Sequence, residues 1–331
     1  MRRRHLLPLL AAAPLGTMVG TAANASEPAI TSSSPDEYPD VLDLRGTPAE
    51  ARPPSDNPIS VFADLGAWHA YALPAAPAEY GGFTGPLYIA EEYPWWLSKA
   101  FNRLTLTDAD TARPIDPAAD RAPRIHAYPG RLSQSFTVDG LRVELELRFA
   151  SDRTAFVRAR VANRGRETRR VRPSWGGSLL RHTADPVQSA PRLAATASGV
   201  AVEFAEVRST WAFFSTEEMR FEIRHRDRVT TTVDGDAYTT ALAEPLRIAP
   251  GRTRELVWTE SFTFTADDRE RALETSRAVL DSPGRFTERG EKRWSKYLGR
   301  ALRGVPADRR RPAVKAVQTL VTNWRGPAGR L

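Results

Sequence analysis

Two pairs of closely spaced glutamates are the first residues in this sequence that could perform acid–base chemistry. Glu91 and Glu92 are neighbours, and Glu144 and Glu146 lie two positions apart in an alternating segment. Hydrolysis by paired carboxylates needs two acidic side chains that flank the same bond. Neighbours in an extended segment point to opposite faces, and Glu144 and Glu146 share the charged, solvated side of a predicted strand. We therefore expect no catalytic residue in this chain.

The residue types used in other kinds of catalysis also lack a suitable arrangement. The five histidines, at positions 5, 69, 126, 182 and 225, do not have the spacing of a metal site. There is no cysteine, which excludes thiolate zinc sites and cysteine nucleophiles. No serine stands in a G-x-S-x-G context, and no glycine-rich phosphate loop is present. We expect neither a metal nor a cofactor.

Two groups of aromatic and polar residues are candidates for contact with a carbohydrate. They comprise Asp64, Trp68, His69, Glu92, Tyr93, Trp95 and Trp96. In one interpretation these side chains help to line a sugar pocket, because aromatic faces stack on pyranose rings. In the other they form an interface between domains, where buried Trp and Tyr commonly anchor contacts. Interface aromatics are the commoner case, so we favour the second interpretation.

The first 25 residues have the pattern of an export signal. Residues 2–5 are basic, residues 6–22 are apolar, and Ala23-Asn24-Ala25 offers an A-x-A cleavage site. The alternative is a transmembrane anchor, but prolines and glycines interrupt the apolar run, which is short for a span. We expect cleavage and a secreted or periplasmic protein. The arginines fit either a Sec or a twin-arginine signal.

Composition limits the class of protein. The chain has 331 residues, of which 41% are hydrophobic, so it can bury a large core without disulfides. Without the three leader arginines, the 47 basic residues fall to 44 against 40 acidic ones, a formal charge of +4. The charges of both signs are interspersed, and no basic stripe would follow a phosphate backbone. A nucleic-acid partner is therefore excluded, as is a membrane span after signal cleavage.

The middle of the chain has the pattern of antiparallel strands. Residues 141–149 alternate between apolar and charged, and Asp139-Gly140 before them suits a two-residue hairpin turn. A second hairpin is expected at Asp234-Gly235, and a third around Asn163-Arg164-Gly165. Further strands are expected at 154–161, 168–175, 200–204, 219–226, 229–233, 238–243 and 255–264. Residues 59–85 show no period and are expected to form long ordered loops. Many short strands with polar turns predict a mainly β fold, a large antiparallel sandwich.

Three helices are expected after the strands. Ala266-Asp267-Asp268 offers a helix N-cap for a run that ends at Leu280, and Ser282-Pro283-Gly284 separates this run from an amphipathic helix at 286–302. A third helix begins near Pro306 and carries one apolar stripe. The stripe comprises Ala313, Val314, Val317, Leu320, Val321 and Trp324. Because such a stripe needs something to pack on, we expect that a further domain is missing after it.

Several stretches resemble one known family. The most specific is Phe62-Ala63-Asp64-Leu65-Gly66-Ala67-Trp68-His69; the others are Gly81 to Pro86 with Glu91-Glu92-Tyr93, and Ala313 to Arg325. Their order and spacing, with those of 145–154 and 208–211, resemble the bacterial branch of glycoside hydrolase family 63, the YgjK-type α-glucosidases.

The resemblance implies a large super-sandwich, a helical linker and an (α/α)₆ barrel that holds the active site. Family members invert the configuration at α-glucosidic bonds of oligosaccharides, with two carboxylates from the barrel. These carboxylates, and a calcium site known in relatives, have no matching positions here. The implied organisation is a cleaved signal peptide at 1–25, an extended arm at 26–58, a β-sandwich at 59–265, a helical linker at 266–304 and the first helix of a truncated (α/α)₆ domain at 305–331.

Two functions from different classes follow. In the first, the chain is the N-terminal part of an α-glucosidase and is inactive alone, with the (α/α)₆ domain as its partner in cis and an α-glucoside oligosaccharide as substrate of the full-length enzyme. In the second, it is a free-standing carbohydrate-binding or interaction module, which predicts a polar C-terminal helix and an open aromatic platform. The apolar stripe favours the first. Unaided hydrolysis by this chain would need a paired acid and base, and we find none.

Overall fold

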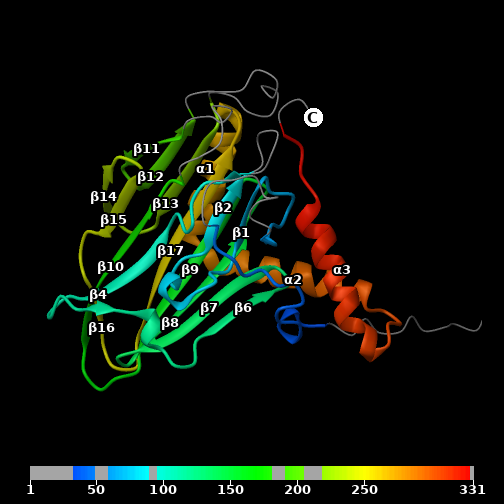
Figure 1. The fold of residues 1–331 in the computed structure, drawn as a ribbon, viewed down its shortest axis with the longest axis horizontal. Coiled ribbons are helices and arrows are strands. Elements are labelled where there is room, and N and C mark those ends of the chain that lie inside the picture. The colour runs from blue at the N-terminus through cyan, green and yellow to red at the C-terminus, as the bar shows by residue number, and fades with distance from the viewer. Residues whose placement is uncertain (1–32, 49–58, 89–94, 181–190, 205–217, 329–331) are drawn as a thin grey trace, which may run out of the picture. The chain divides into compact units, whose positions relative to one another are not determined.

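An eight-stranded antiparallel sheet is the largest element of the computed structural model (Figure 1). The structure describes residues 33–48, 59–88, 95–180, 191–204 and 218–328, which lie within one compact unit. The strand order is β11-β12-β13-β17-β9-β8-β7-β6. The strands are β6 Arg124–Tyr128, β7 Arg131–Val138, β8 Leu141–Phe149, β9 Thr154–Asn163, β11 Pro191–Thr196, β12 Gly199–Phe204, β13 Arg220–His225 and β17 Thr253–Thr263.

A second antiparallel sheet packs against the inner face of the first. Its order is β14-β15-β10-β4-β5, and β16 also pairs with β10. Its strands are β4 Arg103–Asp108, β5 Pro114–Ile115, β10 Arg169–Ser178, β14 Val229–Asp234, β15 Ala237–Leu242 and β16 Leu246–Ile248. One buried cluster joins the two sheets, with Leu145 and Val161 from the first and Val171 and Trp175 from the second. The predicted mainly β sandwich is confirmed.

Strand β8 shows why the sequence forms this sheet. Leu141, Val143, Leu145 and Leu147 point into the core, where each buried side chain contributes about 1.5–3 kcal/mol. The charged residues between them face outward, because successive side chains of a strand alternate. The predicted turn before β8 is present, and Gly140 adopts a φ of 74°, which glycine reaches without strain. The hairpin predicted at Asp234-Gly235 also forms, between β14 and β15.

The hairpin predicted around Asn163-Arg164-Gly165 was wrong. Strand β9 pairs with β8 and β17, whereas β10 pairs with β4, β15 and β16, so the chain crosses here from one sheet to the other. The Asn163 amide fixes the crossover by donating to the carbonyl oxygens of Glu167 at 2.7 Å and Ile248 at 2.9 Å. A turn sequence between two strands therefore does not establish that the strands pair.

Residues 59–85 also differ from the prediction of long loops. They contain β1 (His69–Ala72) and the start of β2 (Thr84–Tyr88), which form a three-stranded sheet with β3 (Trp95–Trp96). Every residue of these three strands is buried. A strand buried on both faces has no polar alternation, which is why the sequence pattern did not reveal it.

Three helices follow the sheets, near the predicted positions. They are α1 (Ala266–Asp281), α2 (Pro283–Ala301) and α3 (Arg310–Asn323). Thr265 caps α1, since its Oγ1 accepts a hydrogen bond from the Asp268 amide at 3.1 Å. Val279 of α1 and Phe286 of α2 pack on Phe156 and Val257, on the outer face of the eight-stranded sheet. The two helices therefore cover part of that face.

The apolar stripe of α3 is only partly buried. Val314 packs against Leu298 of α2 and Tyr38 of the arm, so one end of the stripe lies against the rest of the fold. Leu320 is 72% exposed and Trp324 is 59% exposed. Part of the stripe is therefore buried against the fold, and the part that carries Leu320 and Trp324 is exposed among the residues that the structure describes.

Within the described part of the expected arm, residues 33–48, Tyr38 packs against α2 and α3, and Asp40 lies beside β6. The Asp40 amide donates to the Ala127 carbonyl oxygen at 2.7 Å, and the Ala127 amide donates to Asp40 Oδ1 at 2.8 Å. These bonds cover the edge strand of the large sheet, which would otherwise expose unpaired backbone groups.

Some predictions fall on residues that the structure does not describe. These are the signal peptide, Glu91, Glu92, Tyr93, His182 and residues 208–211. Among the described residues, no helix is both long and apolar enough to cross a membrane.

Candidate functional site

Asp64 of the family-like motif is a buried anchor for α2. Its carboxylate is 0% exposed and accepts four hydrogen bonds. Arg293 donates to Oδ1 at 2.9 Å and to Oδ2 at 2.6 Å, and Trp294 Nε1 donates to Oδ2 at 2.8 Å. The backbone amide of Leu65 donates to Oδ1 at 2.7 Å. A carboxylate with this many donors is held in place, and it has no contact with solvent through which to act on a substrate.

The same motif also holds the segment that follows α3, Arg325–Ala328, here called the C-terminal segment. The Gly326 amide donates to the Gly66 carbonyl oxygen at 2.8 Å, and Trp68 Nε1 donates to the Gly326 carbonyl oxygen at 2.9 Å. Gly66 has a φ of 79°, and a Cβ there would lie 2.5 Å from the Gly326 amide nitrogen. The segment ends with Ala328 buried in the main core.

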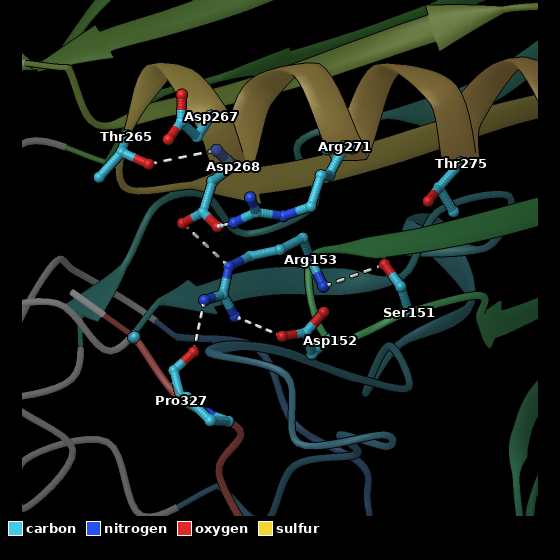
Figure 2. Close-up of a pocket in the computed structure, with 11 residues that line it drawn as sticks. Ser151, Asp152, Arg153, Thr265, Asp267, Asp268, Arg271, Thr275 and Pro327 are labelled. Atoms are coloured by element: carbon cyan, nitrogen blue, oxygen red, sulfur yellow. Dashed lines mark hydrogen bonds and ion pairs between the residues drawn. The ribbon is translucent and has the colours of Figure 1, made fainter. Parts of the chain in front are cut away.

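Arg153 joins the C-terminal segment to the start of α1 (Figure 2). Its Nε donates to Asp268 Oδ2 at 3.2 Å, Nη1 to Asp152 Oδ2 at 2.9 Å, and Nη2 to the Pro327 carbonyl oxygen at 2.7 Å. The residues around it line a pocket of about 650 Å³. The guanidinium already donates to three groups of the protein. The residues of this pocket therefore connect the C-terminal segment to α1, and the pocket is less suited to binding a ligand. Asp64, Gly66, Trp68 and Arg153 are together called the clamp.

His69 lies in an aromatic cluster of the core. Its ring is 5.2 Å from Phe149 and 5.7 Å from Tyr71, centroid to centroid. Burial, and then the positive charge of Arg153, lower the pKa of His69 to about 3. The ring is therefore neutral at physiological pH and is enclosed by the fold.

Trp95 and Trp96 are buried on β3. Trp95 belongs to the main core, and Trp96 packs in a smaller cluster with Ala63, Ala70 and Leu87. The structure thus places Asp64, Trp68 and His69 against elements of the core. Neither Trp95 nor Trp96 is exposed as a platform on which a sugar ring could stack. Glu92 and Tyr93 lie outside the described residues. A role of the seven aromatic and polar candidates at a domain interface stays a prediction.

Sequence reasoning missed one buried carboxyl group, that of Glu260 on β17. It accepts hydrogen bonds from the Tyr71 hydroxyl at 2.7 Å and from Trp258 Nε1 at 2.9 Å. Burial raises the pKa of Glu260, although its hydrogen bonds partly oppose this. The available signal was a glutamate on the apolar face of an otherwise alternating strand.

The raised pKa of Glu260 predicts how stability depends on pH. Because the folded chain favours the protonated form, this contribution to stability is present below the ordinary pKa of 4.5 and is lost as pH rises through the folded pKa. Urea denaturation across pH should show wild type losing more stability than Glu260→Gln as pH increases.

Glu255 on the same strand provides the control. Burial alone would raise its pKa, but Arg158, Arg226 and Arg160 lower it overall, so its contribution is lost as pH falls. Glu255→Gln should therefore lose less stability than wild type as pH falls, which changes the acid side of the plot of stability against pH. Parallel profiles for wild type and Glu260→Gln would contradict the prediction.

The other missed residues, Arg153, Arg293 and Gly326, gave no local signal, because each acts on a residue far away in the sequence. In the ranges that the structure describes, no three His, Asp or Glu side chains lie close enough to hold a metal ion.

The residues of the clamp lie within the range of the sequence that matches a known family. The family described as the N-terminal domain of glucosidase YgjK matches residues 46–295. The chain belongs to this family. The YgjK N-terminal match includes all four clamp residues and the Arg293 and Trp294 donors of α2, and it ends within that helix.

Solved structures align with parts of this chain at low sequence identity. A protein described as a kojibiose phosphorylase from the human microbiome has 8% identity and a TM-score of 0.48, over 77% of this chain and 38% of that one. A protein described as an aldose 1-epimerase from Escherichia coli K12 has 9% identity and a TM-score of 0.40, over 62% and 99%. Heparan sulfate lyase HepC from Pedobacter heparinus has 12% identity and a TM-score of 0.30, over 48% and 23%. The chain thus spans 38% of the length of the kojibiose phosphorylase.

Proposed function

We propose that this YgjK-type domain is the non-catalytic N-terminal part of an exported family 63 α-glucosidase. In this role it holds the helices that lead to an (α/α)₆ catalytic domain in the same chain, and the full-length enzyme hydrolyses α-glucosidic bonds of oligosaccharides. The observation that carries the proposal is the clamp. Within it, Asp64 and Trp68 of the family motif bind α2 and the C-terminal segment to the sandwich, which supports a role in positioning the helices.

The outer side of α3 supports a catalytic domain as partner. Within the described ranges, Leu320 and Trp324 are the large hydrophobic side chains that are exposed. Exposed apolar groups that lie together on one helix are typical of a contact surface. The clamp fixes the end of this helix, because the C-terminal segment follows it directly. We propose that the catalytic domain packs on Leu320 and Trp324.

The state of the carboxylates supports inactivity of this chain alone. Asp64 is saturated with donors, and Glu260 is buried between the sheets. Glu144 is 2.6 Å from Arg142, and Glu146 contacts two arginines at 3.6 and 3.7 Å. Hydrolysis needs two carboxyl groups that flank one bond and are free to contact it, whereas these side chains are engaged with arginines or enclosed by the fold.

An activity assay on the purified chain tests the proposal. We expect no release of glucose from maltose, and no release of nitrophenol from p-nitrophenyl α-glucoside, above the level of a buffer blank. The control is the double variant Glu144→Gln/Glu146→Gln, which removes the pair of carboxylates that share one face of β8. Turnover by the wild type that the double variant lacks would contradict the proposal.

A further inference from the structure

A second groove, separate from the clamp, lies on the outer face of the eight-stranded sheet. It has a volume of about 180 Å³ and lies over β6, β7, β8 and β9, beside the part that α2 covers. It exists because β7 places the small side chains of Ser133 and Ser135 between longer ones on the neighbouring strands. Helix α2 bounds the groove on one side, where Thr287 accepts a hydrogen bond from Arg158 at 3.0 Å.

The register of the strands arranges the groove as two rows of side chains. His126, Ser133, Glu146 and Arg158 are cross-strand partners in the first row. Arg124, Ser135, Glu144 and Arg160 are partners in the second. Neighbouring strands lie about 4.8 Å apart. Each row therefore presents in turn a basic side chain from β6, a serine hydroxyl from β7, a carboxylate from β8 and a guanidinium from β9.

Several polar groups in these rows lack a partner within the described chain. Neither serine hydroxyl makes a hydrogen bond there, nor does the hydroxyl of Tyr128, which also lines the groove. Arg124 has no ion pair among the described residues, and Arg160 has only a distant one, 3.7 Å from Glu255. Other groups of the rows are already engaged, since His126 lies 2.7 Å from Asp40 and Arg158 donates to Glu255 at 2.6 Å. The groove thus offers to a ligand the serine hydroxyls, the Tyr128 hydroxyl and the Arg124 guanidinium, together with the remaining lone pairs of Glu144 and Glu146.

The mixture of charges selects the class of ligand. An anion would meet Glu144 and Glu146, and a cation would meet the arginines of both rows. A neutral hydroxyl can donate to a carboxylate and accept from a guanidinium at the same time, so it suits both. We infer that this groove binds one neutral pyranose unit, for which its volume is adequate. The inference does not rest on the proposed function, because a sugar could bind here in an enzyme or in a free-standing module.

The site should be weak. The Arg131 guanidinium lies 4.1 Å from the centroid of the Tyr128 ring and occupies one of its faces. The His126 ring also packs against Tyr128, with the ring centroids 5.9 Å apart. With stacking restricted in this way, binding depends mainly on hydrogen bonds that replace bonds to water, and each contributes little net free energy. The measurement must therefore detect weak, saturable binding.

Titration of the ¹⁵N-labelled chain, followed by TROSY spectra, tests the inference. The probes are glucose, galactose and mannose as neutral pyranoses, with glucuronate and glucosamine as charged controls. We expect saturable shifts of β7 and β8 amides with at least one neutral sugar, and binding about tenfold or more weaker for both charged sugars. No saturable shift in these strands with any neutral sugar would overturn the inference. Equal or tighter binding of glucuronate would also overturn it, since the groove would then be an anion site.

A matched pair of variants places the binding in the groove. Ser135→Tyr fills the space between the rows without changing any charge, and it should weaken binding about tenfold or more. Thr137→Tyr introduces the same side chain two residues along the same face of β7, outside the groove, and should leave binding unchanged. Spectra with dispersed amide signals establish that both variants fold. Unchanged binding in Ser135→Tyr would show that the sugar binds elsewhere.

Discussion

Replacement of Asp64 by alanine is expected to lower the free energy of unfolding by about 3–5 kcal/mol, because breaking a buried ion pair leaves an unmatched charge behind. The side chain of Arg293, its partner, is only 20% exposed, and both of its Nη atoms would lose their acceptor. Trp294 Nε1 and the Leu65 amide would lose theirs as well. Urea denaturation followed by tryptophan fluorescence measures the loss.

Asp110→Ala is a suitable control for this experiment. Asp110 also pairs with an arginine, Arg170 at 2.7 Å, but both side chains are more than half exposed. Ion pairs of this kind contribute at most about 1 kcal/mol. A loss in Asp64→Ala no greater than that in Asp110→Ala would show that Asp64 does not anchor α2.

Gly66→Ala is expected to have the second largest effect, about 2–4 kcal/mol, by displacing the C-terminal segment. The alanine would be strained at a φ of 79°, and its Cβ would lie 2.5 Å from the Gly326 amide nitrogen. Relief of that contact breaks the hydrogen bonds that Gly326 makes to Gly66 and Trp68. Thermal unfolding measured by circular dichroism follows the change.

A control at Gly235 separates the two causes of the expected loss of stability in Gly66→Ala, which are backbone strain and the close contact with Gly326. It has a φ of 57° in the β14–β15 turn, and a Cβ there would meet no atom within 4 Å. Gly235→Ala therefore carries only the backbone strain, about 1–2 kcal/mol. If the two alanine variants lost equal stability, the close approach of the C-terminal segment to Gly66 would play no part.

The fold was predictable from sequence where the pattern is local. The alternation of residues 141–149 and the Asp139-Gly140 turn each act within a few residues, and both appear in the structure. The N-cap of α1 is Thr265, directly before the predicted Ala266-Asp267-Asp268, because its hydroxyl can accept from the Asp268 amide. The three-stranded sheet was missed because strands buried on both faces carry no alternation. The crossover after β9 was misread because a turn sequence does not say which sheet the next strand joins.

The clamp was predictable only in part, for a related reason. The motif at residues 62–69 identified Asp64 and Trp68 as residues of interest. Their partners could not be named, because Arg293 lies 229 residues after Asp64 and Gly326 lies 258 residues after Trp68. No local pattern records contacts over such distances. Arg153 escaped notice because one arginine among many in a sequence gives no sign of being buried.

Hydrogen exchange measured by mass spectrometry on wild type and Asp64→Asn tests the central claim most directly, that the family motif holds the helices to the sandwich. Asparagine keeps the size of the side chain and removes the ion pair with Arg293. The account predicts faster exchange in α2 and in residues 325–328, with the β7–β8 hairpin unchanged. Unchanged exchange in α2, or an equal increase throughout the chain, would contradict it.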